Sequence, residues 1–169
     1  MDSEPRVEDA MATKFETISP EATVKEAVQK LYASECMGVE GTAEAQAIAV
    51  INEEGKLWGL VTMFDVLRSL GPISLREEEH PHLASLTWEG FFEDIVDMIE
   101  DKKVAEIMTP CSELEIVSPK DRLIVVVEAM IERRVSQLPV CEEGQRIAGI
   151  VRRTDVFNQV AREMLAQEN

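Results

Sequence analysis

Apolar residues recur along this chain with two spacings, and both spacings occur in each half of the sequence. Stripes with a period of 3.6 residues over 24–31 and 123–131 predict two amphipathic helices. Thr23, with Glu26 three positions later, predicts a capping box at the start of the first. Short runs rich in β-branched residues predict strands. These runs lie at 15–18, 47–51 and 57–61, and again at 114–117, 137–141 and 146–151.

Each half therefore has the same order of elements. A strand is followed by a helix, by two strands joined through an acidic turn, and by a final helix. The acidic turns read Glu-Glu-Gly, end at Gly55 and Gly144, and are typical of hairpins. The final helices begin near Asp65 and Asp155. Two β-α-β-β-α units of this kind can pack their sheets together and bury a shared core, which predicts an α/β (α+β) fold.

The two halves also match as sequences. Residues 59–65 read Gly-Leu-Val-Thr-Met-Phe-Asp and residues 149–155 read Gly-Ile-Val-Arg-Arg-Thr-Asp, 90 positions later. The earlier landmarks Ser19 and Ser118 are 118 − 19 = 99 positions apart. The drop in spacing predicts about ten extra residues in a surface loop between Cys36 and Ile48. Matching landmarks in the same order indicate a duplication.

A segment between the two halves belongs to neither copy. Within it, residues 86–99 carry an apolar face that includes Trp88, Phe91, Phe92, Ile95 and Ile99. This pattern predicts a connecting helix that either docks on one of the repeats or lines a dimer interface. The predicted organisation is a first domain at 1–70, a linker with an amphipathic helix at 71–103, and a second domain at 104–169.

Composition narrows the class of protein. The chain has 169 residues and a formal net charge of −16, which disfavours a nucleic-acid partner because phosphates would be repelled. We expect no membrane span and no secretion signal, since no apolar run is long enough and the N-terminus has no basic and apolar leader. Three cysteines form no Cys-x-x-Cys pair, which favours reduced thiols and a cytoplasmic location.

Catalytic and metal-binding patterns are not apparent. His80 and His82 flank a proline after three glutamates, and no third ligand follows at a suitable spacing, so a solvated loop is the favoured interpretation. Two histidines on one loop cannot be assembled with a nucleophile into a catalytic triad. We therefore expect neither an enzyme nor a metal site.

With these features in place, the chain resembles a tandem pair of CBS domains, the module named after cystathionine β-synthase and also called a Bateman module. The matching features are the Val-x-x-x-Met segments at 7–11 and 104–108, Ser-Pro before each central helix, Leu138-Pro139-Val140, the acidic hairpins and the Gly-to-Asp segments. The resemblance covers residues 7–70 and 104–162. It implies two units related by a pseudo-two-fold axis, with up to two clefts between them.

The resemblance also implies a function. Such clefts commonly bind adenosine-containing ligands, namely AMP, ADP, ATP, S-adenosylmethionine or NAD, and we expect AMP or ATP as a regulatory ligand with no required cofactor. It implies a homodimer that senses a ligand and regulates a separate, unidentified protein without catalysis. The alternative is a scaffold or protein-interaction module whose clefts hold no ligand.

By the same resemblance, Asp65 and Asp155 occupy the ribose-binding position, where a carboxylate near a helix N-terminus can accept two hydrogen bonds from a ribose diol. The alternative is that each aspartate only caps its helix. Thr62 matches a hydroxyl residue near ribose or phosphate. The second copy has Arg152 there, so that Thr154 could take over the hydroxyl role. Arg152 and its neighbour Arg153 could instead bind phosphate or lie on a solvated strand end.

The remaining site residues are also implied by the resemblance. Backbone groups for the adenine edge come from Thr17, Ile18, Ile116 and Val117; its apolar walls from Val50, Ile51, Leu138 and Pro139; and the phosphate end from Met108 and Thr109. The alternative for the aliphatic residues is plain core packing. Val50 stands where the family usually has proline. We expect two equivalent sites of unequal affinity, the second better suited to a phosphorylated ligand.

Overall fold

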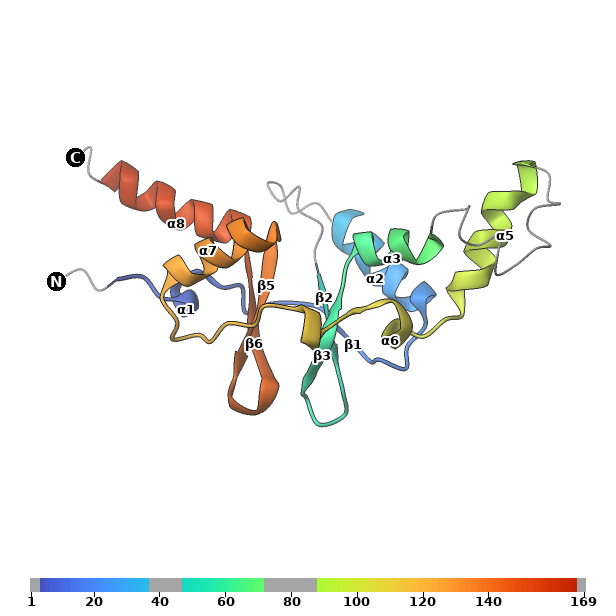
Figure 1. Cartoon of the computed structure of the whole chain (residues 1–169), viewed down its shortest axis with the longest axis horizontal. Coiled ribbons are helices and arrows are strands. Elements are labelled where there is room, and N and C mark those ends of the chain that lie inside the picture. The colour runs from blue at the N-terminus through green and yellow to red at the C-terminus, as the bar shows by residue number, and fades with distance from the viewer. Residues whose placement is uncertain (1–3, 37–46, 72–87, 167–169) are drawn as a thin grey trace.

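The two predicted units are present in the computed structural model, which describes residues 4–36, 47–71 and 88–166 (Figure 1). The predicted loop insertion at 37–46 and the histidines at 80 and 82 lie outside the described residues. The first unit contains β1 (Thr17–Ile18), α2 (Val24–Cys36), β2 (Ile48–Ile51), β3 (Leu57–Val61) and α3 (Met63–Leu70). The second contains α7 (Leu123–Arg133), β5 (Gln137–Glu142), the 3-10 turn η3 (Glu143–Gln145), β6 (Arg146–Arg152) and α8 (Arg153–Ala166).

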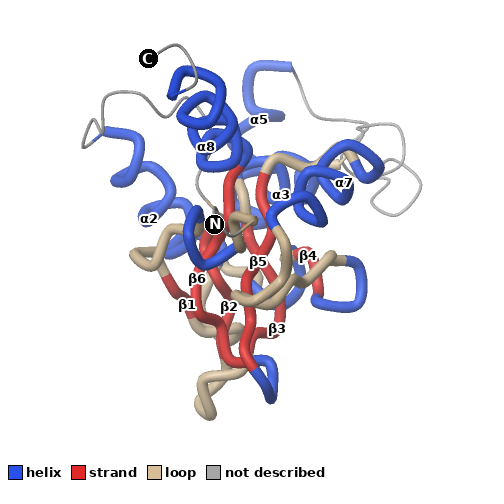
Figure 2. Tube along the Cα trace, turned by 90° about the vertical axis from the view of Figure 1, so that its left-hand side faces the viewer, coloured by secondary structure: helices blue, strands red, loops and turns tan. Residues whose placement is uncertain are grey.

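Short elements and one longer helix connect the units. They are α1 (Val7–Ala10), α5 (Trp88–Glu100), α6 (Val104–Ile107), β4 (Thr109–Pro110) and the 3-10 turn η2 (Cys111–Glu113). In Figure 1 the helices α2, α3, α7 and α8 lie above the two hairpins, whose tips point down. The side view in Figure 2 shows the strands of both sheets layered below the helices.

Each sheet is completed by a segment from the other half of the chain. In the first sheet β1 pairs parallel to β2, β2 pairs antiparallel to β3, and β3 pairs antiparallel to β4, which precedes the second unit. The second sheet contains β5 and β6. It is extended by single bridges from Val117 to Val140 and from Ala12 to Ile150. Ala12, which precedes the first unit, therefore plays the same part as β4.

Two glycines permit this exchange of segments. A Cβ on Gly59 would lie 2.4 Å from the carbonyl oxygen of Thr109, and a Cβ on Gly149 would lie 2.6 Å from that of Ala12. Real Cβ atoms do not approach so closely, so only glycine allows the crossing segments to contact these strands. The repeated glycine of the Gly-to-Asp segment is thus a packing requirement.

The short helices follow the same exchange. The amide of Val7 in α1 donates to the carbonyl of Asp121 at 3.0 Å, and the amide of Val104 in α6 donates to that of Ala22 at 2.7 Å. Val7 is fully buried in the core of the second unit, and Val104 is fully buried in the core of the first. Each unit is therefore stabilised by the segment that precedes the other.

The two sheets pack against each other, as the sequence predicted. A central cluster of buried apolar residues lies between them, and the hairpin tips meet in a bridge between Lys56 and Arg146. The central cluster contains Ala47, Ala49, Leu57 and Leu60 from the first unit, and Cys141 and Ile150 from the second. Burial of these side chains from both units supplies the shared core.

The predicted helix start at Thr23 is confirmed, whereas the predicted strands at 15–18 and 114–117 are too long. The Thr23 amide donates to Glu26 Oε2 at 2.8 Å and the Glu26 amide donates to Thr23 Oγ1 at 3.2 Å, which is the predicted capping box. The predicted strand at 15–18 is reduced to β1, and of 114–117 only Val117 forms a bridge. Phe15 and Ile116 pack against the central cluster without ladder bonds, because an apolar pattern reports burial and not pairing.

The connecting helix docks on the first unit. Ile95 and Ile99 of α5 are buried, and Ile99 belongs to the same core cluster as Val24 of α2 and Val104 of α6. α5 contacts both α2 and α3. The predicted start at residue 86 lies outside the described residues. Within the described ranges, no helix combines the length and the apolar character that a bilayer crossing would need.

Candidate functional site

The first strand-to-helix junction holds a buried carboxylate. Thr62 is the N-cap of α3, and Asp65 caps the same helix from its third position, within the first turn. Asp65 Oδ2 accepts from the Thr62 amide at 2.8 Å and from the Thr62 hydroxyl at 3.0 Å. Together with the Asp65 amide, which donates to the Thr62 hydroxyl at 3.4 Å, these bonds form a capping box. Only 2% of Asp65 is exposed.

The other oxygen of this carboxylate is bonded by the second half of the chain. Asp65 Oδ1 accepts from the Thr109 hydroxyl at 2.8 Å and from Arg68 Nη2 at 2.9 Å. Thr109 comes from β4, so the exchange of segments places its hydroxyl on Asp65. The carboxylate has about four acceptor positions, and four donors fill them. A ligand hydroxyl must therefore replace one of these donors.

The second junction holds an ion pair at the equivalent position. Asp155 Oδ2 accepts from the Arg152 amide at 3.0 Å and from Arg152 Nε at 2.9 Å, while Oδ1 accepts from Arg152 Nη2 at 3.0 Å. The side chains of Arg152 and Asp155 are 24% and 15% exposed. Arg152 is thus not on a solvated strand end in this structure. Its guanidinium occupies both oxygens that a ribose diol would need.

The other polar residues at the second junction take different positions. The Thr154 hydroxyl is buried and, among the described residues, has no hydrogen-bond partner. Thr154 therefore does not bond Asp155 as Thr62 bonds Asp65, because Arg152 occupies the position before the helix and makes that contact. Arg153 is exposed at the first position of α8, and its amide donates to the carbonyl of Ser136 at 2.7 Å.

A small cavity lies between the units next to Arg152. Its volume is about 40 Å³, and it is lined by Ala12, Lys14, Phe15, Ala47, Gln137, Ile150 and Arg152. Ligand pockets usually have volumes of about 300–1,000 Å³, so this cavity is too small for a nucleoside in this conformation.

Of the residues that line this cavity, sequence reasoning predicted only Arg152 as a site residue and missed the two other polar ones. Lys14 supplies a cation, and Gln137 accepts from the Ala47 amide at 3.3 Å across the two units. The counterpart of Lys14 in the second copy is Cys111, at the 97-residue spacing of Met11 and Met108. Only the first copy has a cation at this position, and this difference between the copies could have indicated Lys14 as a site residue from the sequence.

The predicted adenine-binding residues lie mostly in the cores. Ile18, Val50, Val117, Leu138 and Pro139 are buried, so plain core packing describes them in this structure. Thr17, Ile51 and Ile116 are half-buried. None of these eight residues lines the small cavity. Met108 is half-buried and packs against the core of the first unit, beside Thr109.

The described part of the chain offers little reactive chemistry. It contains no group of three or more histidine, cysteine or acidic side chains arranged to hold a metal ion. Cys111 and Cys141 are free thiols. Burial raises the pKa of Cys111, and burial with the nearby Cys111 raises the pKa of Cys141 to about 11. A thiol with a raised pKa is protonated near neutral pH and is a poor nucleophile.

Comparison with known proteins identifies both units. A model of the CBS domain matches residues 7–72 and 104–162. The chain is 28% identical over 145 residues to the chloroplastic CBS domain-containing protein CBSX1 of Arabidopsis thaliana, covering 82% of this chain and 56% of that protein. It is 33% identical over 118 residues to an uncharacterised 33.4 kDa protein from a ribosomal RNA operon of Thermofilum pendens, covering 70% and 34%.

Solved structures share the fold. CBSX2 in complex with AMP has a TM-score of 0.65 at 19% identity, covering 94% of this chain and 98% of that one. The CBS domain pair of protein MJ0100, in complex with methylthioadenosine and S-adenosylmethionine, has a TM-score of 0.64 at 17% identity, covering 95% and 99%. Because the family model matches both repeats over most of the sequence, the chain belongs to the CBS domain family and contains a tandem CBS pair.

Proposed function

We propose that this chain is a regulatory module that binds adenosine-containing ligands in the clefts between its two CBS domains and thereby controls a separate protein. The observation that carries the proposal is that each strand-to-helix junction holds a carboxylate, Asp65 or Asp155. Both carboxylates accept several hydrogen bonds from nearby donor groups. Structures of the same fold are described with AMP and with S-adenosylmethionine. The cytosolic domain of the Mg²⁺ channel MgtE, with a TM-score of 0.59 and 21% identity, is described with ATP.

At the first site, binding is an exchange of neutral donors. A ribose hydroxyl takes the place of the Thr109 hydroxyl on Asp65 Oδ1, where the present bond is 2.8 Å long. One O–H donor replaces another, so the net cost is small. Because β4 carries Thr109, this exchange releases a contact between the two halves and gives a ligand a means of changing their relative placement.

At the second site, binding is an exchange of ions. The Arg152 guanidinium must leave Asp155 before a ribose diol can bind, and a ligand phosphate offers it an equivalent bidentate partner. Lys14 and Arg153 add positive charge nearby. A nucleotide such as AMP or ATP therefore binds here better than adenosine, because its phosphate replaces the Asp155 carboxylate as the partner of Arg152.

We propose that the protein is a cytoplasmic homodimer, and exposed helix faces support the dimer. Leu67 on α3 and its counterpart Phe157 on α8, 90 positions later, are 58% and 67% exposed, and Phe64 on α3 is 69% exposed. Single exposed apolar residues are normal, whereas a repeated set across two helix faces is typical of an interface. A second copy related by a two-fold axis would cover both faces at once.

Isothermal titration calorimetry tests the proposal. Adenosine, AMP, ATP, S-adenosylmethionine and NAD are titrated into the wild-type protein and into Asp65→Ala and Asp155→Ala variants. We expect binding of AMP or ATP, with each substitution removing one class of site. If no ligand gives heat or a thermal shift at millimolar concentration, the proposal is wrong.

A ligand-free scaffold is the second candidate. The observations that favour it are the two fully engaged carboxylates and the volume of only about 40 Å³ beside Arg152. In that case Asp65→Ala and Asp155→Ala leave partner binding unchanged, and soaking crystals with AMP leaves the hydrogen bonds of Arg152 intact.

A further inference from the structure

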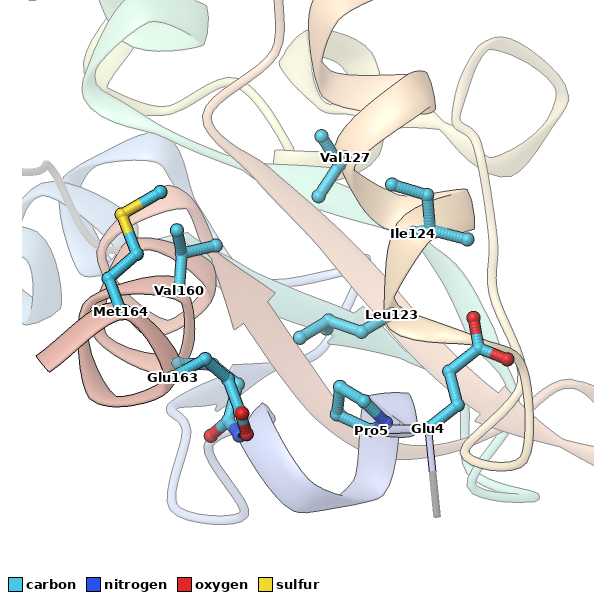
Figure 3. Close-up of a pocket in the computed structure, with 9 residues that line it drawn as sticks. Glu4, Pro5, Leu123, Ile124, Val127, Val160, Glu163 and Met164 are labelled. Carbon is cyan, nitrogen blue, oxygen red and sulfur yellow. Dashed lines mark hydrogen bonds between the residues drawn. The ribbon is translucent and has the colours of Figure 1, made fainter. Parts of the chain in front are cut away.

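An apolar groove lies between α7 and α8, away from the clefts. Its volume is about 280 Å³, and it shares no lining residue with the small cavity beside Arg152. Figure 3 shows Val160 and Met164 of α8 facing Ile124 and Val127 of α7, with Leu123 and Pro5 between them. Met164 is 68% exposed and Ile124 is 46% exposed. We call this surface the α7–α8 groove.

The internal duplication shows what covers the equivalent surface of the first unit. At the 99-residue spacing, Leu123 and Val127 correspond to Val24 and Val28 of α2, and at the 90-residue spacing Val160 corresponds to Leu70 of α3. The match extends to the backbone, because the Leu123 amide donates to the Pro5 carbonyl at 2.9 Å just as the Val24 amide donates to the Lys102 carbonyl at 2.8 Å. In the first unit α5 packs onto α2 and α3.

The two cores differ where α5 contributes. The second core contains the buried residues Val7, Leu123, Val140 and Val151, which correspond to Val104, Val24, Val50 and Val61 of the first. Ile99 of α5 is 4% exposed in the first core, but its counterpart at the 97-residue spacing is Asp2, which is polar and lies outside the described residues. The second core, as described, has no apolar side chain in that role.

From this difference we infer that the α7–α8 groove is a docking site for an amphipathic helix of a partner protein. The helix would place branched apolar side chains four residues apart, as α5 does with Ile95 and Ile99. The partner helix would bind in the groove as α5 binds on the surface of α2 and α3.

Charge at the rim determines which helix fits. On the first unit, Lys25 bonds Glu100 of α5 at 3.5 Å, and α5 has acidic residues and no lysine or arginine. The counterpart of Lys25 is Ile124, so this cation is missing from the α7–α8 groove. Its rim instead carries Glu163 and Glu4, the latter paired with Arg122 at 2.5 Å. The acidic α5 of a second copy is therefore disfavoured, and a helix with lysine or arginine beside its apolar stripe is favoured.

Fluorescence anisotropy with two stapled helical peptides tests the inference. One peptide copies residues 88–100, and the other has the same apolar residues with lysine in place of Glu93, Asp97 and Glu100. We expect the basic peptide to bind the wild-type protein and the acidic copy to bind at least about tenfold more weakly. Glu163→Lys should reverse or abolish this preference.

A matched pair of variants separates the groove from general charge effects. Met164→Lys places a cation in the groove and should weaken binding of the basic peptide by about tenfold or more. Leu165→Lys makes the same charge change at a residue that is 61% exposed and does not line the groove, and should have a much smaller effect. Thermal unfolding of both variants verifies that they are folded.

Four results would overturn the inference. The basic and acidic peptides could bind equally well, neither could bind, or Leu165→Lys could weaken binding as much as Met164→Lys. Light scattering could instead show that Met164→Lys turns a dimer into a monomer while the basic peptide fails to bind, which makes a second copy the occupant. The inference extends the partner-binding part of the proposed function. The peptide experiment contains no nucleotide, so its failure is distinguishable from a failure of the calorimetric test.

Discussion

Replacing Arg152 with threonine should convert the second site into a copy of the first. The first copy has Thr62 at this position, where its hydroxyl lies in a capping box with Asp65. In Arg152→Thr the guanidinium no longer bonds the two oxygens of Asp155 at 2.9 and 3.0 Å. The carboxylate then becomes available to a ribose diol, and the phosphate loses its principal cation.

The magnitude follows from the strength and exposure of this ion pair. Its side chains are mostly buried, at 24% and 15% exposed, so water weakens the pair only in part. A hydrogen bond to a charged group contributes about 1.5–3 kcal/mol net, which is about a 10- to 150-fold change in affinity. We expect the preference of this site for AMP over adenosine to fall by a factor in that range.

Calorimetry of an Asp65→Ala background isolates the second site for this measurement. Adenosine and AMP are titrated into proteins that carry arginine or threonine at position 152, and the ratio of the two dissociation constants is compared. Arg152→Lys serves as the control, because it keeps the charge but loses the bidentate geometry. An unchanged ratio of adenosine to AMP affinity in Arg152→Thr would refute the ion-exchange reasoning.

Three further predictions concern stability. Gly59→Ala puts a Cβ 2.4 Å from the Thr109 carbonyl oxygen and should lower the free energy of unfolding by about 1–3 kcal/mol in urea titration. Gly90→Ala should not, because the nearest atom to its Cβ, Asp94 Oδ2, would lie at an ordinary contact distance of 3.9 Å. Ile99→Ala should cost about 2–5 kcal/mol and expose α5 to proteolysis at native conditions; equal protease resistance would contradict its docking role. Because the pKa of Cys141 is raised to about 11, its contribution to stability is complete below about pH 9 and declines as pH rises towards 11, so thermal melts of wild type and Cys141→Ala should converge there.

Local features of the fold could be predicted from the sequence. The Thr23–Glu26 capping box and the hairpin strands depend on residues close in the chain, so their patterns are visible without a structure. The prediction of a strand at 114–117 was wrong because Ile116 packs against the central cluster without pairing to another strand. Periodicity reveals which side chains are buried but not which backbone groups are bonded.

The two carboxylates of the candidate site could be located from the sequence, but their contacts and the residues around the cavity could not. The repeated Asp65 and Asp155 followed from the duplicated segment. The bond from Thr109 to Asp65 joins residues 44 positions apart through the exchange of segments, and no local pattern signals it. Arg152 was recognised as a departure between the copies, but whether it faces phosphate or Asp155 depends on a side-chain rotamer that only the structure gives.

The exchange of leading segments has a consequence for how the chain folds during synthesis. The first unit cannot complete its sheet until β4, at Thr109–Pro110, has left the ribosome, and the second unit needs Val7, which precedes the first unit in the sequence. The amide of Val7 bonds the carbonyl of Asp121, a closure of more than one hundred residues. We therefore expect that neither CBS domain folds independently and that the pair folds in one cooperative step.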